Sequence, residues 1–209
     1  MITIINYNVG NLGSISNMLN YLGIPNKIGT NIDDIINATK LILPGVGSFD
    51  YGMKQLRQSG IKDHLEHKVN LMQTPILGIC LGMQLMCKSS DEGEQTGLGW
   101  FDASVEKFDL KKMDRDRSVP HTGWNGVSVT NSHWVSDDLP SDLRFYFVHS
   151  YHTVCNQKSD EWMTSTYGYP FASAIAKENK IAVQFHPEKS HKFGLAILKR
   201  FAEWNYVQK

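Results

Sequence analysis

Residues 75–84 have the sequence Pro-Ile-Leu-Gly-Ile-Cys-Leu-Gly-Met-Gln, in which a cysteine at position 80 stands between two glycines. The apolar run from Ile76 to Ile79 predicts a strand, and the residues from Met83 to Cys87 open a helical pattern. Glycine weakens strands and helices, so two glycines flanking one thiol indicate a tight turn with no room for side chains. The stretch therefore predicts a strand–turn–helix unit with Cys80 at the turn.

Strand and helix patterns alternate through the first half of the chain. Short apolar runs at Ile2 to Asn6, Ile24 to Ile28 and Leu41 to Leu43 predict strands. Apolar residues recur at helical spacing from Leu12 to Leu22, and the stretch from Asp50 to Leu71 is helical in pattern with one break. This alternation predicts the α/β fold class, with a mostly parallel central sheet and helices on both faces.

The second half of the chain is richer in short strand patterns joined by turns. The expected strands are Val127 to Thr130, Phe145 to His149, Met163 to Tyr167, Ala172 to Ala176 and Ile181 to Phe185. Their short connections predict antiparallel strands added to the sheet in this half. An amphipathic helix is expected from about Lys192 to Trp204, and the charged segment Asp109 to Ser118 predicts a surface loop.

Length and composition restrict the function. The chain has 209 residues, which predicts one domain over residues 1–209. Basic and acidic residues balance at 21 each, which gives no field for nucleic acid and favours a small ligand or a protein partner. The three cysteines form no disulfide framework, the first residues lack a signal-peptide pattern, and no window approaches the ~18 apolar residues of a membrane span. We expect a cytoplasmic protein with reduced thiols and with neither cofactor nor metal.

Cys80 stands where a strand of a parallel sheet passes into a helix, and ligands bind beyond the carboxyl ends of such strands. The Gly-x-Cys-x-Gly spacing matches the nucleophile elbow of hydrolases, with sulfur in place of oxygen. The partial positive charge of a helix N-terminus favours the thiolate, which is the reactive form. The alternative is a buried packing cysteine beside a glycine-rich turn, and this motif alone leaves it open.

A nucleophilic thiol needs a base and a group that orients the base. Residues 183–190 have the sequence Val-Gln-Phe-His-Pro-Glu-Lys-Ser, with His186 and Glu188 two positions apart at the end of an apolar strand. Positions i and i+2 of an extended segment face the same way, and Pro187 stiffens the link. The pattern predicts that Glu188 holds one ring nitrogen of His186 and directs the other toward Cys80.

Acyl transfer also needs hydrogen-bond donors for the tetrahedral oxyanion. The backbone N–H of Leu81, directly after the nucleophile, is the standard first donor of an elbow. The loop Pro44-Gly45-Val46-Gly47 follows a neighbouring strand, and its two glycines allow peptide orientations closed to other residues. A loop that flips its peptide could switch activity on, although the segment taken on its own is better explained as an ordinary strand-to-helix turn.

Together these motifs resemble the class I glutamine amidotransferases, in which a Cys-His-Glu triad hydrolyses glutamine, and the resemblance covers nearly the whole chain. It implies that family's three-layer fold. Four finer motifs are similar to the glutaminase subunit of imidazole glycerol phosphate synthase: Gly10-Asn11-Leu12, PGVG at 44–47, PHTGWN at 120–125 and YFVHSY at 146–151.

The resemblance implies roles for the site residues. Cys80 attacks the side-chain amide of glutamine, His186 protonates the departing ammonia and Glu188 orients His186. The oxyanion is held by the N–H groups of Leu81 and, after the Gly45–Val46 peptide flips, of Val46.

The resemblance also implies a glutamine-binding set made of Gly47, Gln84, Glu92, Ser150 and Tyr151. A carboxylate such as Glu92 suits the ammonium group of glutamine. Within its polar run, however, Glu92 has the alternative of a solvated loop residue.

A partner is implied because free ammonia is mostly protonated in neutral water and must be handed over directly. In this family the partner is a (β/α)8 barrel cyclase, and the heterodimer makes imidazole glycerol phosphate and AICAR in histidine biosynthesis. Asn11 and Trp124 match interface positions, and an exposed tryptophan suits a binding hot spot. The alternative for Trp124 is a place in the core.

Two departures from the family pattern leave the partner open. Thr122 stands where methionine is usual, and Gly13-Ser14 replaces a commoner Arg-Ser pair. A paralogous subunit of similar sequence supplies ammonia for amidine formation on a surface sugar. A stand-alone γ-glutamyl hydrolase and a non-catalytic interaction module with a relic pocket are the remaining alternatives.

Overall fold

The computed structural model describes residues 1–113 and 118–206. Its strands are β1 (Ile2–Ile5), β2 (Asn26–Gly29), β3 (Lys40–Gly45), β4 (Ile76–Cys80), β5 (Ser89–Ser90), β6 (Ala103–Lys107), β7 (His121–Gly126), β8 (Ser128–Val129), β9 (Arg144–His149), β10 (Tyr151–Cys155), β11 (Glu161–Tyr167), β12 (Tyr169–Lys177) and β13 (Lys180–Val183). Its α-helices are α1 (Leu12–Tyr21), α2 (Ile32–Ile36), α3 (Phe49–Gln58), α4 (Lys62–Glu66), α5 (Leu81–Leu85) and α6 (His191–Glu203). The short 3₁₀ or π segments are η1 (His67–Leu71), η2 (Leu110–Lys112), η3 (Trp134–Ser136), η4 (Lys158–Asp160) and η5 (Pro187–Lys189).

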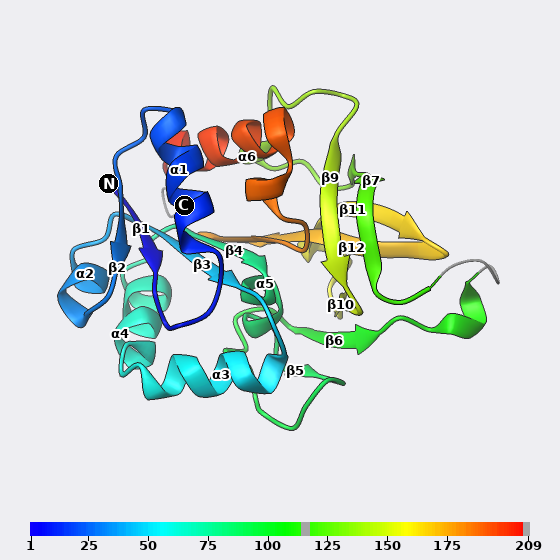
Figure 1. Cartoon of the computed structure of the whole chain (residues 1–209), viewed down its shortest axis with the longest axis horizontal. Coiled ribbons are helices and arrows are strands. Elements are labelled where there is room, and N and C mark those ends of the chain that lie inside the picture. Colours follow the sequence, from blue (N-terminus) through cyan, green and yellow to red (C-terminus); the bar gives the residue numbers. More distant parts are fainter. Residues whose placement is uncertain (114–117, 207–209) are drawn as a thin grey trace.

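A large sheet carries strands from both halves of the chain (Figure 1). Strands β2, β1, β3, β4 and β13 pair in this order, and all of these pairs are parallel. Beyond β13 the sheet continues through the antiparallel pairs β13–β12, β12–β10 and β10–β6. This confirms the α/β fold class, a mostly parallel centre with antiparallel strands added by the C-terminal half. Strands β7 and β9 form a separate antiparallel pair.

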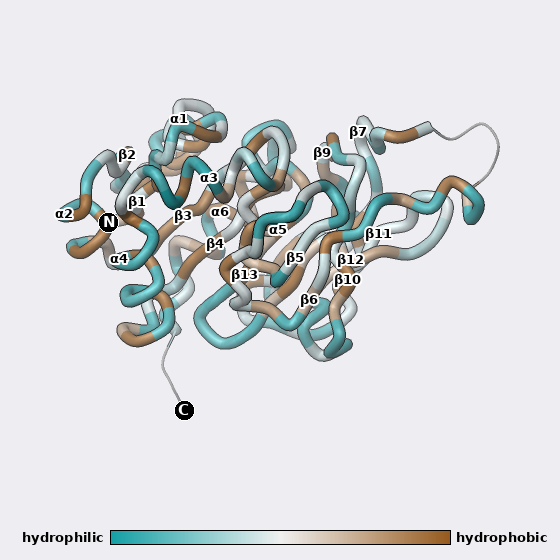
Figure 2. The backbone as a smooth tube through the Cα atoms, turned by 90° about the horizontal axis from the view of Figure 1, so that it is seen from below, coloured by the Kyte–Doolittle hydropathy of each residue, from teal (hydrophilic) through white to brown (hydrophobic). Residues whose placement is uncertain are grey.

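Helices cover both faces of the sheet, which makes three layers. In Figure 1, α1 and α6 lie on one side of the central strands and α3, α4 and α5 on the other. The period of two in β3 explains both interfaces: Leu41 and Leu43 pack in the cluster that contains Met53 of α3, whereas Ile42 packs with Phe201 of α6. Figure 2 shows the resulting hydrophobic track along the central strands β3 and β4.

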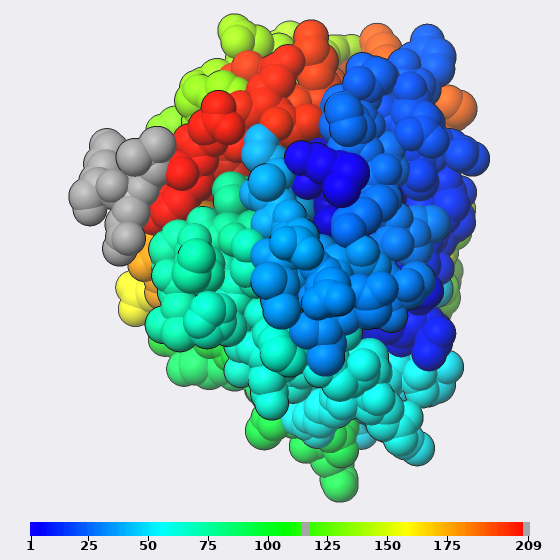
Figure 3. Space-filling model, turned by 90° about the vertical axis from the view of Figure 1, so that its left-hand side faces the viewer, coloured from blue at the N-terminus to red at the C-terminus, as the bar shows by residue number. Residues whose placement is uncertain are grey.

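The first and last helices of the chain pack on one another. Buried Ile15 and Leu19 of α1 share a core cluster with Ile197 and Phe201 of α6. Figure 3 shows the surface of this region, where the blue N-terminal residues lie beside the red C-terminal helix. None of the helices within the described residues combines the length and the apolar character that a membrane crossing requires.

Several expected boundaries were wrong. The helix after Cys80 begins at once with Leu81 rather than at Met83, and the second strand begins at Asn26 because the preceding residue is a proline without an N–H. The strand expected at Val127 to Thr130 shortens to β8. The break expected in Asp50 to Leu71 is present after α3.

The elements missed from the sequence include α2, β6, β7 and β10, which are short or contain polar residues and glycine. The five-residue helix α2 depends on its N-cap, where the Asn31 side chain accepts from Asp34 N at 2.9 Å. Strands β6, β7 and β10 are polar or glycine-containing and depend on pairing with distant strands. Within the loop expected at Asp109 to Ser118 lies η2, and residues 114–117 lie outside the described residues.

Candidate active site

The turn at Cys80 has the strained backbone of a nucleophile elbow. Cys80 ends β4 with φ +54° and ψ −110°, a region that a residue with a side chain rarely adopts. A Cβ on Gly82 would lie 1.9 Å from the carbonyl oxygen of Leu43, and a Cβ on Gly78 would lie 2.9 Å from Met86 Sδ. The two glycines therefore let the elbow pack directly against the neighbouring strand and helix.

His186 and Glu188 form a buried pair next to this elbow. His186 Nδ1 lies 2.7 Å from Glu188 Oε1, and their side chains are 1% and 3% exposed. The His186 N–H donates to the carbonyl of Tyr146 at 2.9 Å. The hydroxyl of Ser190 donates to the His186 carbonyl at 2.6 Å and accepts from the Tyr146 N–H at 3.0 Å. Backbone bonds on both sides thus hold the histidine in place.

The surroundings of His186 favour its protonated form. Burial by itself lowers the pKa of His186, but contact with Cys80 and Glu188 outweighs burial and raises the pKa to about 10. Within the described residues, the buried Nε2 atom of His186 makes no hydrogen bond of acceptable distance and angle, so it is available to the thiol or to substrate. Burial raises the pKa of Cys87 and of Cys155 to about 12 and keeps both protonated.

A cavity of about 290 Å³ opens over the elbow. Its walls contain Val46, Gly47, Cys80, Leu81, Gln84, Glu92, Pro120, Val148, His149, Ser150, Tyr151 and His186. The structure thus brings together most of the side chains predicted for catalysis and glutamine binding, from positions more than 100 residues apart. Glu188 stands behind His186. Gly45 lies beneath the cavity, where a Cβ would come within 2.8 Å of the Leu81 Cβ.

The expected oxyanion loop lies at the cavity mouth. The hydroxyl of buried Tyr7 donates to the Pro44 carbonyl at 2.6 Å, and burial followed by the Cys80 charge raises the pKa of Tyr7 far above its usual range. Beyond this anchor the loop is open: Val46 is 46% exposed, and Gly47 has φ +104° with free space around it. The Gly45–Val46 peptide therefore lies between the anchored Pro44 and the exposed residues Val46 and Gly47.

Glu92 is held in place and is no solvated loop residue. Its Oε2 accepts from the N–H of Phe49, the first residue of α3, at 2.8 Å. The N–H of Glu92 in turn donates to Ser90 Oγ at 3.1 Å. A helix N-terminus attracts a carboxylate, so α3 orients Glu92 at the cavity wall.

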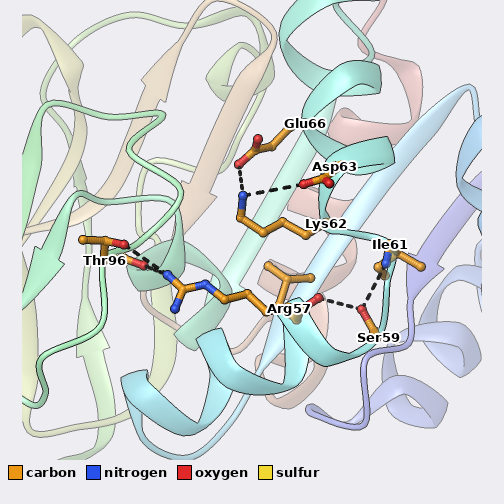
Figure 4. Close-up of polar contacts among 8 residues, drawn as sticks. Arg57, Ser59, Ile61, Lys62, Asp63, Glu66 and Thr96 are labelled. Atoms are coloured by element: carbon orange, nitrogen blue, oxygen red, sulfur yellow. Dashed lines mark hydrogen bonds and ion pairs between the residues drawn. The ribbon is translucent and has the colours of Figure 1, made fainter.

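The loop after Glu92 is fastened to α3 at two further points. The Asp50 carboxylate accepts from the N–H groups of Glu94 and Gln95, at 3.1 and 3.0 Å. Figure 4 shows Arg57 reaching from α3 to Thr96, where it donates to the carbonyl at 2.8 Å and to the hydroxyl at 3.0 Å. These contacts fix the approach of Glu92 to the cavity.

Gln84 and Tyr151 meet in the cavity wall. The buried Gln84 side chain donates from Nε2 to the Tyr151 carbonyl at 3.4 Å and to Gln184 Oε1 at 3.1 Å. The Tyr151 carbonyl also lies 2.7 Å from Nδ1 of His149. Burial is the main cause that lowers the pKa of His149 to about 3, so this ring is neutral near pH 7 and donates from Nδ1.

The two predicted interface residues lie outside the cavity. Asn11 is exposed and directly precedes α1. Trp124 on β7 is 42% exposed, which excludes the core position, and its ring stacks on that of His191 with centroids 5.6 Å apart. His191 begins α6 and lies five residues after His186, so the exposed tryptophan contacts the segment that carries the catalytic pair.

Sequence reasoning missed two buried residues beside the pair, although both are in the quoted segment 183–190. Gln184, two positions before His186, carried no signal beyond being a polar residue at the end of an apolar strand. Ser190 carried no signal, because its role depends on a hydrogen bond to distant Tyr146. The expectation that His186 and Glu188 pair within an extended segment was wrong, because Pro187–Lys189 form a 3₁₀ turn that brings the two side chains together.

A thiol, an imidazole and a carboxylate at the carboxyl edge of an α/β sheet define a cysteine-dependent acyl-transfer enzyme. Within residues 1–113 and 118–206 no three His, Cys, Asp or Glu side chains are grouped to hold a metal ion.

Comparison with known proteins agrees with this class. The sequence model of the family Glutamine amidotransferase class-I matches residues 4–204, and the chain belongs to this family. "Imidazole glycerol phosphate synthase subunit HisH 2" of Methanococcus maripaludis is 48% identical over 96% of this chain and 98% of its own. The protein of the same name from Pseudomonas aeruginosa is 45% identical over 97% of this chain and 99% of its own.

Solved structures support the fold. A crystal structure described as glutamine amidotransferase has a TM-score of 0.72 to this chain at 20% identity, and the match covers 97% of this chain and 98% of that chain. The crystal structure of a glutamine amidotransferase from Thermotoga maritima has a TM-score of 0.64 at 18% identity, over 97% of this chain and 80% of that chain. The three-layer architecture is therefore that of the glutamine amidotransferase fold.

Proposed function

We propose that this chain is the glutaminase subunit of an imidazole glycerol phosphate synthase, which hydrolyses glutamine to glutamate and passes the ammonia to a synthase subunit. The observation that carries the proposal is the single cavity that holds Cys80, His186 and Glu92, with Glu188 bonded to the imidazole. Two relatives, identical at 48% and 45% over nearly their whole length, carry the name of this subunit.

Glutamine would bind with its amide at Cys80 and its charged end at the wall that contains Glu92. One oxygen of Glu92 is held by α3, which leaves the other for the ammonium group of the substrate. Gln84, Gly47 and the backbone of Ser150 and Tyr151 line the same cavity and supply polar groups for the amino-acid end.

In the first chemical step the Cys80 thiolate attacks the amide carbon, and the carbonyl oxygen becomes an oxyanion. The N–H of Leu81 and, after a flip of the Gly45–Val46 peptide, the N–H of Val46 donate to this oxygen. The imidazolium of His186 gives its proton to the amide nitrogen. The C–N bond then breaks, which leaves a γ-glutamyl thioester and releases ammonia.

In the second step the neutral His186 takes a proton from water, which attacks the thioester carbon. The C–S bond breaks, glutamate leaves, and the thiolate–imidazolium couple is restored. Glu188 accepts from Nδ1 throughout, so the other nitrogen, Nε2, always faces the reacting atoms.

The ammonia acceptor lies on a partner subunit, a (β/α)8 barrel cyclase that makes imidazole glycerol phosphate and AICAR in histidine biosynthesis. The exposed residues Asn11 and Trp124 would contribute to the interface. Residues 1–209 act as one domain in this heterodimer, and the cytoplasm, where thiols stay reduced, suits a thiolate nucleophile.

A second candidate uses the same chemistry and differs only in the acceptor, a surface sugar that receives an amidine. It is favoured by Thr122 and Gly13 near the expected interface, and by the names of both relatives above, which carry the number 2. Purification of the partner from the source organism and identification of its aminated product distinguishes the two acceptors.

The glutaminase proposal is tested by glutamate release from the purified chain, alone and with its partner and partner ligand. Hydrolysis should rise strongly with partner and ligand, and Cys80→Ala should abolish it while partner binding persists. Turnover of Cys80→Ala at the wild-type rate would refute the proposed nucleophile.

A further inference from the structure

Gln184 is fully buried beside the nucleophile, and the steps described so far leave it unused. Its side-chain Nε2 lies 3.7 Å from Cys80 Sγ, which is within hydrogen-bond distance for a sulfur acceptor. Its backbone N–H donates to the Ser173 carbonyl at 2.9 Å and so fixes the residue at the end of β13. Gln184 precedes His186 by two residues, and both side chains contact the thiol from this one segment.

Neighbouring groups determine which end of the Gln184 amide faces the sulfur. The Tyr151 carbonyl can only accept, so the Gln84 atom beside it at 3.4 Å must be the nitrogen. This nitrogen also lies 3.1 Å from the second amide, which must present its oxygen there. The Gln184 amide therefore has its nitrogen toward Cys80, and a reversed amide would place two N–H groups against one another.

The arrangement favours the ionised thiol over the neutral one. A thiolate has no proton and accepts hydrogen bonds well, whereas a neutral thiol is a weak acceptor. Because the Gln184 side chain is fully buried, its N–H interacts more strongly with a charged sulfur than it would in water. A group that binds one protonation state more strongly shifts the equilibrium toward that state.

We infer that Gln184 is a further residue of the catalytic site: its amide N–H stabilises the Cys80 thiolate, and Gln84 holds that amide in the required orientation. The inference rests on the proposed function, in which Cys80 is the nucleophile and Gln84 binds glutamine. It adds a link between them, because Gln84 both lines the cavity and donates to the amide that faces the sulfur.

The test is the pH–rate profile of Cys80 alkylation by iodoacetamide, which needs no glutamine. Cys87 and Cys155 are buried with pKa values raised to about 12, and peptide mass spectrometry assigns the alkylated site. The titratable groups that surround Cys80 or are coupled to its site are His186, Glu188, Tyr7, His149, Glu92 and Tyr151. All of them stay unchanged in the variants.

Gln184→Met keeps the size of the side chain and removes the N–H. Its alkylation profile should move to higher pH by about one unit, which is about tenfold slower alkylation on the acid limb. Gln184→Glu keeps the acceptor for Gln84 and should also be slowed at least tenfold at pH 8. Exposed Gln58→Met is the matched control and should alkylate at the wild-type rate.

Unchanged profiles in folded Gln184 variants would overturn the inference while leaving the glutaminase proposal intact. If the wild-type chain does not hydrolyse glutamine but the alkylation profile of the Gln184 variants shifts as expected, the glutaminase proposal is refuted and the inference about Gln184 stands. A measurement on the unsubstituted chain is independent of variant folding: the Gln184 side-chain amide proton should move downfield in NMR spectra as Cys80 ionises. An amide signal that stays constant through that ionisation would also overturn the inference.

Discussion

Gly82→Ala perturbs the contact on which the elbow depends. The added Cβ would stand 1.9 Å from the Leu43 carbonyl oxygen and 2.9 Å from its carbon, and real Cβ contacts are essentially never below 3.0 Å. At least 1.1 Å of movement is therefore required, from 3.0 Å minus 1.9 Å. Leu43 lies in β3, which pairs with β1 on one side and β4 on the other, so the strand cannot yield alone.

The magnitude follows from this lack of freedom. Overpacking of a rigid core costs about 1–3 kcal/mol, and a backbone clash inside a paired strand belongs at the upper end, ~3 kcal/mol. Because α5 begins directly after Cys80, the movement also displaces the thiol by about 1 Å. A displacement of that size lowers the rate of the chemical step by about 100-fold.

Urea unfolding and glutamine hydrolysis of the partner-bound enzyme measure the two effects. Gly13→Ala is the matched control for unfolding of the chain alone, because a Cβ at Gly13 of α1 meets nothing within 4 Å. Alanine in a helix is more stable than glycine by up to about 1 kcal/mol, so this variant should equal or exceed the wild type in stability. The packing argument fails if Gly82→Ala unfolds within ~0.5 kcal/mol of the wild type, a typical surface effect.

The remaining predictions concern substrate binding and acid stability. Glu92→Gln should raise KM for glutamine by about 10–100-fold with a smaller change in kcat, since a charged hydrogen bond to the ammonium is lost; an unchanged KM in steady-state assays would contradict the assigned role. The pKa of His149 is lowered to about 3 in the folded chain. Below about pH 6.5 the unfolded chain therefore binds a proton that the folded chain does not. As the pH is lowered from about 6.5 toward 3, the free energy of unfolding decreases by about 1.4 kcal/mol per pH unit. His149→Gln should remove this contribution, so that unfolding free energies at pH 7 and pH 5 differ by about 2 kcal/mol less than in the wild type; an equal difference would show that His149 titrates normally when folded.

The triad and the elbow could be predicted because their signals are local. Two glycines around Cys80 indicate a turn with no room for side chains. His186 and Glu188 are close in sequence and do pair, but through the 3₁₀ turn Pro187–Lys189 and not through the extended segment that their spacing predicted. The alternation of strand and helix patterns was sufficient to predict the three layers, because helices must cover both faces of each central strand.

Other features depend on contacts between distant segments. Glu92 resembled a solvated loop residue until Phe49 placed a helix N-terminus against it. His121 and His149 lie 2.9 Å apart across the β7–β9 pair, yet β7 has no apolar alternation that would predict a strand. The orientation of the Gln184 amide follows from a hydrogen-bond chain through Gln84, which single-residue patterns do not encode.

The central claim is that Cys80 is the nucleophile served by His186, and trapping the acyl-enzyme tests it most directly. The partner-activated enzyme is mixed with glutamine, quenched in acid within the first turnover and digested for mass spectrometry. The account predicts a γ-glutamyl thioester on the peptide that contains Cys80, absent in Cys80→Ala and much reduced in His186→Ala. Active enzyme that accumulates no adduct on Cys80, or that carries it on Cys87 or Cys155, would contradict the account.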